Sequence, residues 1–155
     1  MTLSFRYTML FFVLLALTVS SAFGQARPDP ELVKFVNGWG EAFVKQETGK
    51  LSSWLDDSPD LIYLPSAGDP IRGRENVSSA FNATFHAMDG LEAQVEWSRI
   101  ASEGETAWVV LSMNETVQYG TDTLRLGVVQ SFTMLKRSVG WRIVMMHESV
   151  AAATE

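Results

Sequence analysis

The spacing of apolar residues changes at Asp89 and Gly90, and this change limits the fold more than any other feature of the sequence. Before it, apolar residues recur at helical intervals, and from Leu91 onward they alternate with polar residues. A period of two is typical of a strand with one buried face. Short glycine-containing turns separate the alternating segments, which predicts an antiparallel meander. The expected strands cover residues 91–98, 107–117, 123–136 and 141–150.

The segment before the meander is expected to supply helices. Asp29 followed by Pro30 predicts a helix start, because Asp caps free amide groups and Pro fits the first helical position. Apolar residues then recur at helical spacing until Gly49, near which we expect this helix to end. Helices that precede strands in this way indicate an α+β fold. The remaining elements expected here are a short helix at 51–55, a strand at 61–65 and a helix at 75–88.

Residues 1–26 have the organisation of a secretory signal peptide. Arg6 gives a weakly positive start, residues 9–19 are an unbroken apolar run, and small residues follow. The run is too short to span a bilayer, and an uncleaved N-terminal anchor is the alternative interpretation. We expect cleavage after Gly24 or Ala26 and a secreted or periplasmic protein. A single domain at residues 27–155, with no membrane association after cleavage, would remain.

The composition argues against several classes of partner. The chain of 155 residues has no cysteine, which excludes disulfides and lipoprotein attachment. A net charge of −6 with scattered basic residues argues against binding to nucleic acid or to anionic membranes. Two distant histidines give no metal signature, and there is no glycine-rich phosphate loop. We therefore expect neither a metal nor another cofactor.

Three asparagines, Asn76, Asn82 and Asn114, stand in Asn-x-Ser/Thr sequons. In a eukaryotic secretory pathway such residues accept glycans. Chance occurrence is the simpler interpretation, since in a bacterium these sequons would have no meaning.

Short motifs occur in a defined order along the chain: TGK (48–50), LDDSPDLIYLP (55–65), IRGRENV (71–77), TAWVVLSM (106–113) and GWRIVMMHES (140–149). In this order and spacing the chain resembles the NTF2-like superfamily, in its SnoaL-like branch related to ketosteroid isomerases. The resemblance implies an α+β cone in which three N-terminal helices pack on a curved, mainly antiparallel sheet and enclose a pocket. Some members are enzymes that act on small hydrophobic molecules, and others only bind, so the fold does not decide the function.

The residues that perform ketosteroid isomerisation in that family are not matched in this sequence. Its general-base Asp would stand at Leu64. Its oxyanion-holding Tyr would stand near Trp39 and Phe43, and its buried acid within residues 133–136. Abstraction of a proton beside a carbonyl needs a base and a group that holds the oxyanion. Ketosteroid isomerisation is therefore not expected.

His147, near the end of the last expected strand, is the strongest candidate for chemistry. By alternation it should share an inward face with Met145 and Ser149, which would leave Glu148 in solvent. An imidazole titrates near neutral pH and can move protons. In the alternative interpretation, His147 only lines a pocket or satisfies local backbone groups.

Tyr63 and Asp57 are the candidate partners of His147 in catalysis. Tyr63 has apolar neighbours and could reach a pocket with its hydroxyl, or it could be an ordinary core residue. Asp57 could act as a catalytic carboxylate, although the adjacent Ser58 and Pro59 favour a turn. With these residues the protein would be a cofactor-independent isomerase, cyclase, dehydratase or hydrolase.

The main functional interpretation is an exported binding module for a small hydrophobic molecule or a protein partner. The strand at 107–117 is apolar on both faces in its first half, which favours a homodimer that covers the outer face. Large aromatic residues, methionines and the polar end of the last strand are expected to line the pocket. These are Trp39, Tyr63, Phe81, Phe85, Trp97, Trp108, Met113, Phe132, Met145, His147 and Ser149.

Overall fold

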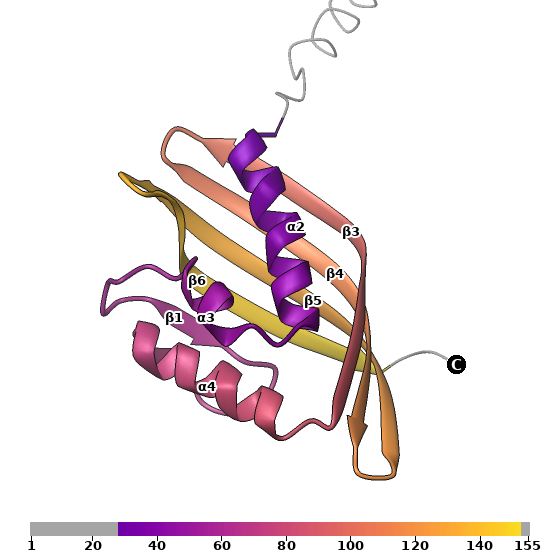
Figure 1. The fold of residues 1–155 in the computed structure, drawn as a ribbon. Coiled ribbons are helices and arrows are strands. Elements are labelled where there is room, and N and C mark those ends of the chain that lie inside the picture. The colour runs from indigo at the N-terminus through magenta and orange to yellow at the C-terminus, as the bar shows by residue number, and fades with distance from the viewer. Residues whose placement is uncertain (1–27, 153–155) are drawn as a thin grey trace, which may run out of the picture.

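The computed structural model describes residues 28–152, which form a curved sheet with helices on one of its faces (Figure 1). The expected signal peptide at 1–26 lies outside the described residues. The sheet has six strands in the order β2-β1-β6-β5-β4-β3. Neighbouring strands are antiparallel except for β1 and β6, which are parallel. The expected α+β class and the mainly antiparallel sheet are confirmed.

Most of the sheet is the meander that the alternation predicts. It consists of β3 (Gly90–Glu103), β4 (Thr106–Tyr119), β5 (Asp122–Arg137) and β6 (Gly140–Ala152). The short strands β1 (Ile62–Leu64) and β2 (Ile71–Arg72) extend the sheet beyond β6. Strand β2 was not predicted, because a strand of two residues is too short to show alternation.

The helices are α2 (Pro30–Val44), α3 (Thr48–Ser52) and α4 (Arg74–His86). Asp29 caps α2 as expected, since its carboxylate accepts a hydrogen bond from the Glu31 amide at 2.8 Å. Helix α2 ends at Val44 and not near Gly49, because the chain turns at Gln46, which has a left-handed φ of 56°. Figure 1 shows α2 and α4 on the same face of the sheet.

An aromatic core joins the helices to this inner face of the sheet. Trp39 of α2 is fully buried, and its ring lies 4.9 Å from that of Phe132 on β5 and 6.0 Å from that of Phe81 on α4. Gly40 allows α2 to approach β3, because a Cβ at this position would lie 3.2 Å from Val95 Cγ2.

A bulge in β3 changes which of its side chains face this core. Val95 pairs with Met113 and Trp97 pairs with Ser112, which leaves Glu96 as an extra residue. One extra residue reverses the alternation beyond it. Trp97 therefore lies on the outer face, where it is 46% exposed.

A second bulge, in β6, has the same effect near the end of the chain. Thr133 pairs with Met145 and Met134 pairs with Ile143, which leaves Val144 as the extra residue. Ile143 faces the core before the bulge, and Met145 lies on the outer face after it. Every residue of β6 beyond the bulge is thus on the opposite face from the one that simple alternation predicts.

Candidate functional site

A cavity of about 270 Å³ lies between α4, the end of α2 and the inner face of the sheet. Strands β4, β5 and β6 form its floor, and β1 with the loop that follows forms one side. The walls are mainly aromatic and aliphatic, and two carboxyl groups, from Glu115 and Glu148, enter from the floor. The lining residues are Phe43, Tyr63, Pro65, Ser66, Ala67, Phe81, Thr84, Phe85, Met88, Glu115, Val117, Tyr119, Leu126, Val128, Glu148 and Val150.

Glu148 is held by a chain of hydrogen bonds that begins in the core. Trp39 Nε1 donates to Gln130 Oε1 at 2.8 Å, and Gln130 Nε2 donates to Glu148 Oε2 at 3.0 Å. The hydroxyl of Ser66 donates to Glu148 Oε1 at 3.4 Å. Because Gln130 is fully buried, its amide must keep both partners, and this fixes the orientation of the Glu148 carboxylate.

Glu115 is the second acidic group of the cavity, and it is only 6% exposed. Its Oε1 atom has no hydrogen-bond partner. Burial, assisted by the negative charge of Glu148, raises the pKa of Glu115 to about 7, because a low-dielectric environment disfavours the ionised form. At neutral pH this carboxyl group therefore exchanges between its protonated and ionised states.

Tyr63 lies in the wall between these acids and the helices. Its ring is 5.7 Å from that of Phe81, and the residue is 8% exposed. Burial raises the pKa of Tyr63, and the negative charge of Glu148, a hydrogen bond of the Tyr63 hydroxyl with Glu148 and the charge of Glu115 raise it further. The side chain thus stays a neutral phenol that can donate a hydrogen bond.

His147 is on the opposite side of the sheet from this cavity. It pairs with Ser131 on β5 and Leu64 on β1, and its side chain is exposed. The expected inward orientation of His147 is wrong, because the bulge at Val144 reverses the alternation. For the same reason Glu148, which we expected in solvent, faces the cavity.

The residues expected to line a pocket fall into groups. Those that line the cavity are Tyr63, Phe81 and Phe85. Trp39 and Phe132 are buried in the aromatic core, and Met113 is buried beside a separate cleft. The remaining five lie on the outer face of the sheet, as corrections to the prediction: Trp97, Trp108, Met145, His147 and Ser149.

Asp57, the other proposed partner of His147, lies at the surface. Its side chain is 83% exposed and pairs with the guanidinium of Arg74. The neighbouring Asp56 is buried and accepts hydrogen bonds from the Ser58 amide at 2.9 Å and from Arg137 Nε at 2.7 Å. The hydrogen bond from Arg137 holds the pKa of Asp56 below its usual value. The structure thus shows the turn that the sequence favoured, and Asp57 does not line the cavity.

A model of the SnoaL-like domain matches residues 32–153. The chain belongs to this SnoaL-like family. No curated protein matches the sequence.

Solved structures of similar fold include an NTF2-like family protein from Streptomyces avermitilis. It is 19% identical, with a TM-score of 0.68, and the match covers 79% of this chain and 96% of that chain. An NTF2-like superfamily protein from Salmonella enterica is 18% identical, with a TM-score of 0.67 and coverage of 81% and 90%. A ketosteroid isomerase-like protein from Erwinia carotovora atroseptica is 13% identical, with a TM-score of 0.63 and coverage of 76% and 92%. At these identities the likeness shows a shared fold.

The polar residues that this SnoaL-like domain directs into its cavity were missed by the sequence analysis. Glu115 alternates with Met113 and Val117, so a carboxyl group on the buried face of β4 could have been recognised from the pattern. Gln130 occupies a similar position on β5. Glu148 could not be recognised as inward-facing from the sequence, because nothing in the sequence around Val144 indicates the bulge.

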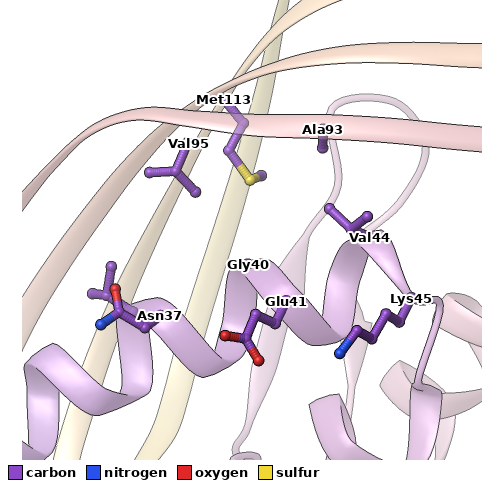
Figure 2. Close-up of a pocket in the computed structure, with 9 residues that line it drawn as sticks. Asn37, Gly40, Glu41, Val44, Lys45, Ala93, Val95 and Met113 are labelled. Atoms are coloured by element: carbon purple, nitrogen blue, oxygen red, sulfur yellow. The ribbon is translucent and has the colours of Figure 1, made fainter.

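A second, more open cleft of about 470 Å³ lies between α2 and β3. Figure 2 shows Val95 and Ala93 of β3 above α2, with Met113 reaching in from β4. The charged side chains of Glu41 and Lys45 are directed away from the strands. Polar groups therefore do not converge in this cleft, and it is a weaker candidate than the cavity.

Within residues 28–152, no cluster of His, Asp or Glu side chains has an arrangement suited to a metal ion. None of the helices in this range is both long enough and apolar enough to cross a membrane.

Proposed function

We propose that this SnoaL-like domain binds a small, mainly apolar molecule in the cavity between α4 and the sheet. The observation that carries this proposal is a mainly apolar cavity into which a few polar groups converge, which is the usual character of a ligand site. The volume, about 270 Å³, is just below the range of about 300–1,000 Å³ that is usual for ligand pockets, which favours a small ligand.

The arrangement of the polar groups supports specific recognition. Glu148 is oriented by Gln130 and Ser66, so its position does not depend on a ligand. Glu115 has a free acceptor atom, and Tyr63 offers a neutral hydroxyl. A ligand would pack its apolar part against Phe81 and its neighbours and direct its polar part toward the floor of the cavity.

An enzyme of the SnoaL-like kind is the second candidate, and one observation favours it. The pKa of Glu115, raised to about 7, suits a group that donates and accepts a proton at neutral pH. Glu115 would then take the general acid–base role that the sequence suggested for His147. Tyr63 would stabilise developing negative charge by donating a hydrogen bond. The reaction would be an isomerisation, cyclisation, dehydration or hydrolysis without a cofactor.

A thermal-shift screen of small hydrophobic molecules tests ligand binding. The wild type is compared with Thr84→Trp, which would fill the mouth of the cavity, and with His147→Ala on the outer face. Ligands should stabilise the wild type and His147→Ala equally, by about 2.7 kcal/mol at a hundredfold excess over Kd. They should not stabilise Thr84→Trp. Equal stabilisation of Thr84→Trp would mean that the ligand binds elsewhere.

Turnover of the same ligands separates an enzyme from a binding protein. Each ligand is incubated with the wild type and with Glu115→Gln, and products are sought by mass spectrometry. Products from the wild type and none from Glu115→Gln, with binding retained, would support the enzyme. Binding without products from any ligand favours the binding module.

We also propose that the protein is a homodimer that associates through the outer face of the sheet. Trp97 and Trp108 are each 46% exposed on this face, and Met145 is 37% exposed. Exposed apolar groups of this size favour an interface that covers them. Light scattering should give the mass of a dimer at micromolar concentration, and the mass of a monomer would contradict this part of the proposal.

Export is the remaining part of the proposed function, and it rests on the expected signal peptide. When the full chain is expressed with a secretion pathway, the exported protein should begin at residue 25 or 27. N-terminal sequencing checks this directly, and an exported or retained protein that still begins at Met1 would contradict it.

A further inference from the structure

All the charged side chains that line the cavity are acidic. Its titratable lining residues are Glu115 and Tyr119 from β4, Glu148 from β6 and Tyr63 from β1. The lining side chains from α2, α4 and β5 are uncharged, and no Lys, Arg or His lines the cavity. A carboxylate or phosphate group on a ligand would therefore meet negative charge without a cation to pair with, in a buried place where this is costly.

The free acceptor in the cavity requires a hydrogen-bond donor. Glu115 is more than nine-tenths buried, and its Oε1 has no partner in the protein. A buried acceptor without a donor costs about 1–3 kcal/mol, and a ligand that supplies the donor recovers this free energy. Glu148 is different, because Gln130 and Ser66 already donate to it. The acid that a ligand should address is therefore Glu115, which lines the cavity and has unused hydrogen-bonding capacity.

Aromatic side chains surround these acids. Phe43, Phe81, Phe85, Tyr63 and Tyr119 line the cavity from α2, α4, β1 and β4. Aromatic rings bury apolar groups and also attract cations through their faces. The cavity thus combines an acidic floor with walls that suit an organic cation.

We infer that the ligand of this site is a small organic ammonium ion, an apolar body with a primary or secondary amine. Its N–H group donates to Glu115, while Glu148 supplies a second negative charge to the same cavity. The inference rests on the proposed function and adds the chemical class of the ligand. A neutral alcohol could also donate to Glu115, but it would gain nothing from the second acid.

Binding of an ammonium ion should change the protonation state of Glu115. In the empty cavity burial keeps the pKa of Glu115 near 7, and an ammonium ion beside it would favour the ionised form. Binding below this pH therefore releases a proton. The affinity for an amine should rise between pH 6 and pH 8, whereas the affinity for an alcohol should not.

Isothermal titration calorimetry with three compounds of similar size tests the inference. The probes are 2-phenylethylamine, 2-phenylethanol and phenylacetate at pH 7.5, with the wild type, Glu115→Gln and the outer-face control His147→Gln. We expect the amine to bind about tenfold or more tightly than the alcohol, a difference of about 1.4 kcal/mol, and phenylacetate not to bind. Glu115→Gln should remove this advantage, and His147→Gln should keep it.

The possible outcomes separate the inference from the proposed function. Equal binding of the amine and the alcohol, lost in Thr84→Trp, would overturn the ammonium inference and leave ligand binding in the cavity intact. Tighter binding of phenylacetate would also overturn it. Binding of none of the three probes to the wild type would count against both proposals. An unchanged preference for the amine in Glu115→Gln would show that Glu115 is not the group that recognises the cation.

Discussion

The two faces of the sheet are formed by the same strands and carry opposite chemistry. On the inner face, Glu115 and Glu148 enter a cavity with aromatic walls. On the outer face, His147 is exposed beside partly exposed apolar residues such as Trp108. On the inner face, burial and a neighbouring negative charge raise the pKa of Glu115, whereas on the outer face His147 is exposed to solvent.

A single extra residue in β6, Val144, decides which side chains after it lie on each face. Without the bulge at Val144, His147 would face the helices and Glu148 would face solvent. Bulges of this kind commonly redirect a side chain near a functional site. In this protein the bulge determines which of two neighbouring polar residues can meet a ligand.

Neighbouring methionines give the sharpest test of this comparison. Met146 is fully buried on the inner face, and Met145 is 37% exposed on the outer face. Met146→Ala should lower the free energy of unfolding by about 2–5 kcal/mol, because it leaves a cavity in the core. Met145→Ala should lower the free energy of unfolding of the isolated monomer by less than about 1 kcal/mol. Denaturant unfolding measures both, and the opposite order would show that β6 has no bulge at Val144.

The pH dependence of stability tests the burial of Glu115. Its pKa is raised from 4.5 to about 7 in the folded protein, so the folded state binds the proton more tightly than the unfolded state. This contribution is fully present below pH 4.5 and is lost as the pH rises through 7, and it amounts to about 3 kcal/mol. Glu115→Gln should flatten the profile in this range. Parallel profiles for the variant and the wild type would contradict the account.

Loss of the hydrogen-bond chain from the core to Glu148 should lower the free energy of unfolding by a measurable amount. Trp39→Phe keeps an aromatic ring and leaves the buried acceptor of Gln130 without a donor, which should cost about 1–3 kcal/mol. Trp54→Phe is the control, because the indole of Trp54 lies in the same aromatic cluster, 6.0 Å from the ring of Trp39. Equal losses of unfolding free energy would show that packing alone explains the effect at Trp39.

The smallest change in the free energy of unfolding is expected when His147 is replaced. Its exposed side chain on the outer face makes His147→Ala nearly neutral, with a change of about 0.5 kcal/mol or less in the free energy of unfolding. Ligand affinity should be unchanged as well. A loss of ligand binding in this variant, with folding intact, would return His147 to the functional site.

Much of the fold could be predicted because it depends on repeated patterns. The cap at Asp29 depends on a strong local preference, and the alternation from Leu91 onward involves many residues. The structure contains the helix and the meander that these two patterns predict. The end of α2 at Val44 and the strand β2 could not be predicted, because each depends on packing around one or two residues.

The site was harder to predict than the fold, since it depends on the face to which individual residues point. Tyr63, Phe81 and Phe85 come from regular elements without a bulge, and they line the cavity as their apolar surroundings suggested. His147 and Glu148 exchanged faces because an extra residue in a strand has no reliable sequence marker. Glu115 was overlooked although its alternation with Met113 placed it on the buried face of β4.

The titration of Glu115 tests the central claim most directly. Carbon-13 NMR of protein labelled at the glutamate carboxyl groups, with the signal assigned by its absence in Glu115→Gln, follows the protonation of this residue. We expect a midpoint near 7, because Glu115 is buried in the same cavity as Glu148. A midpoint near the ordinary value of 4.5 would show that Glu115 is open to solvent, and the acidic cavity would lose its basis.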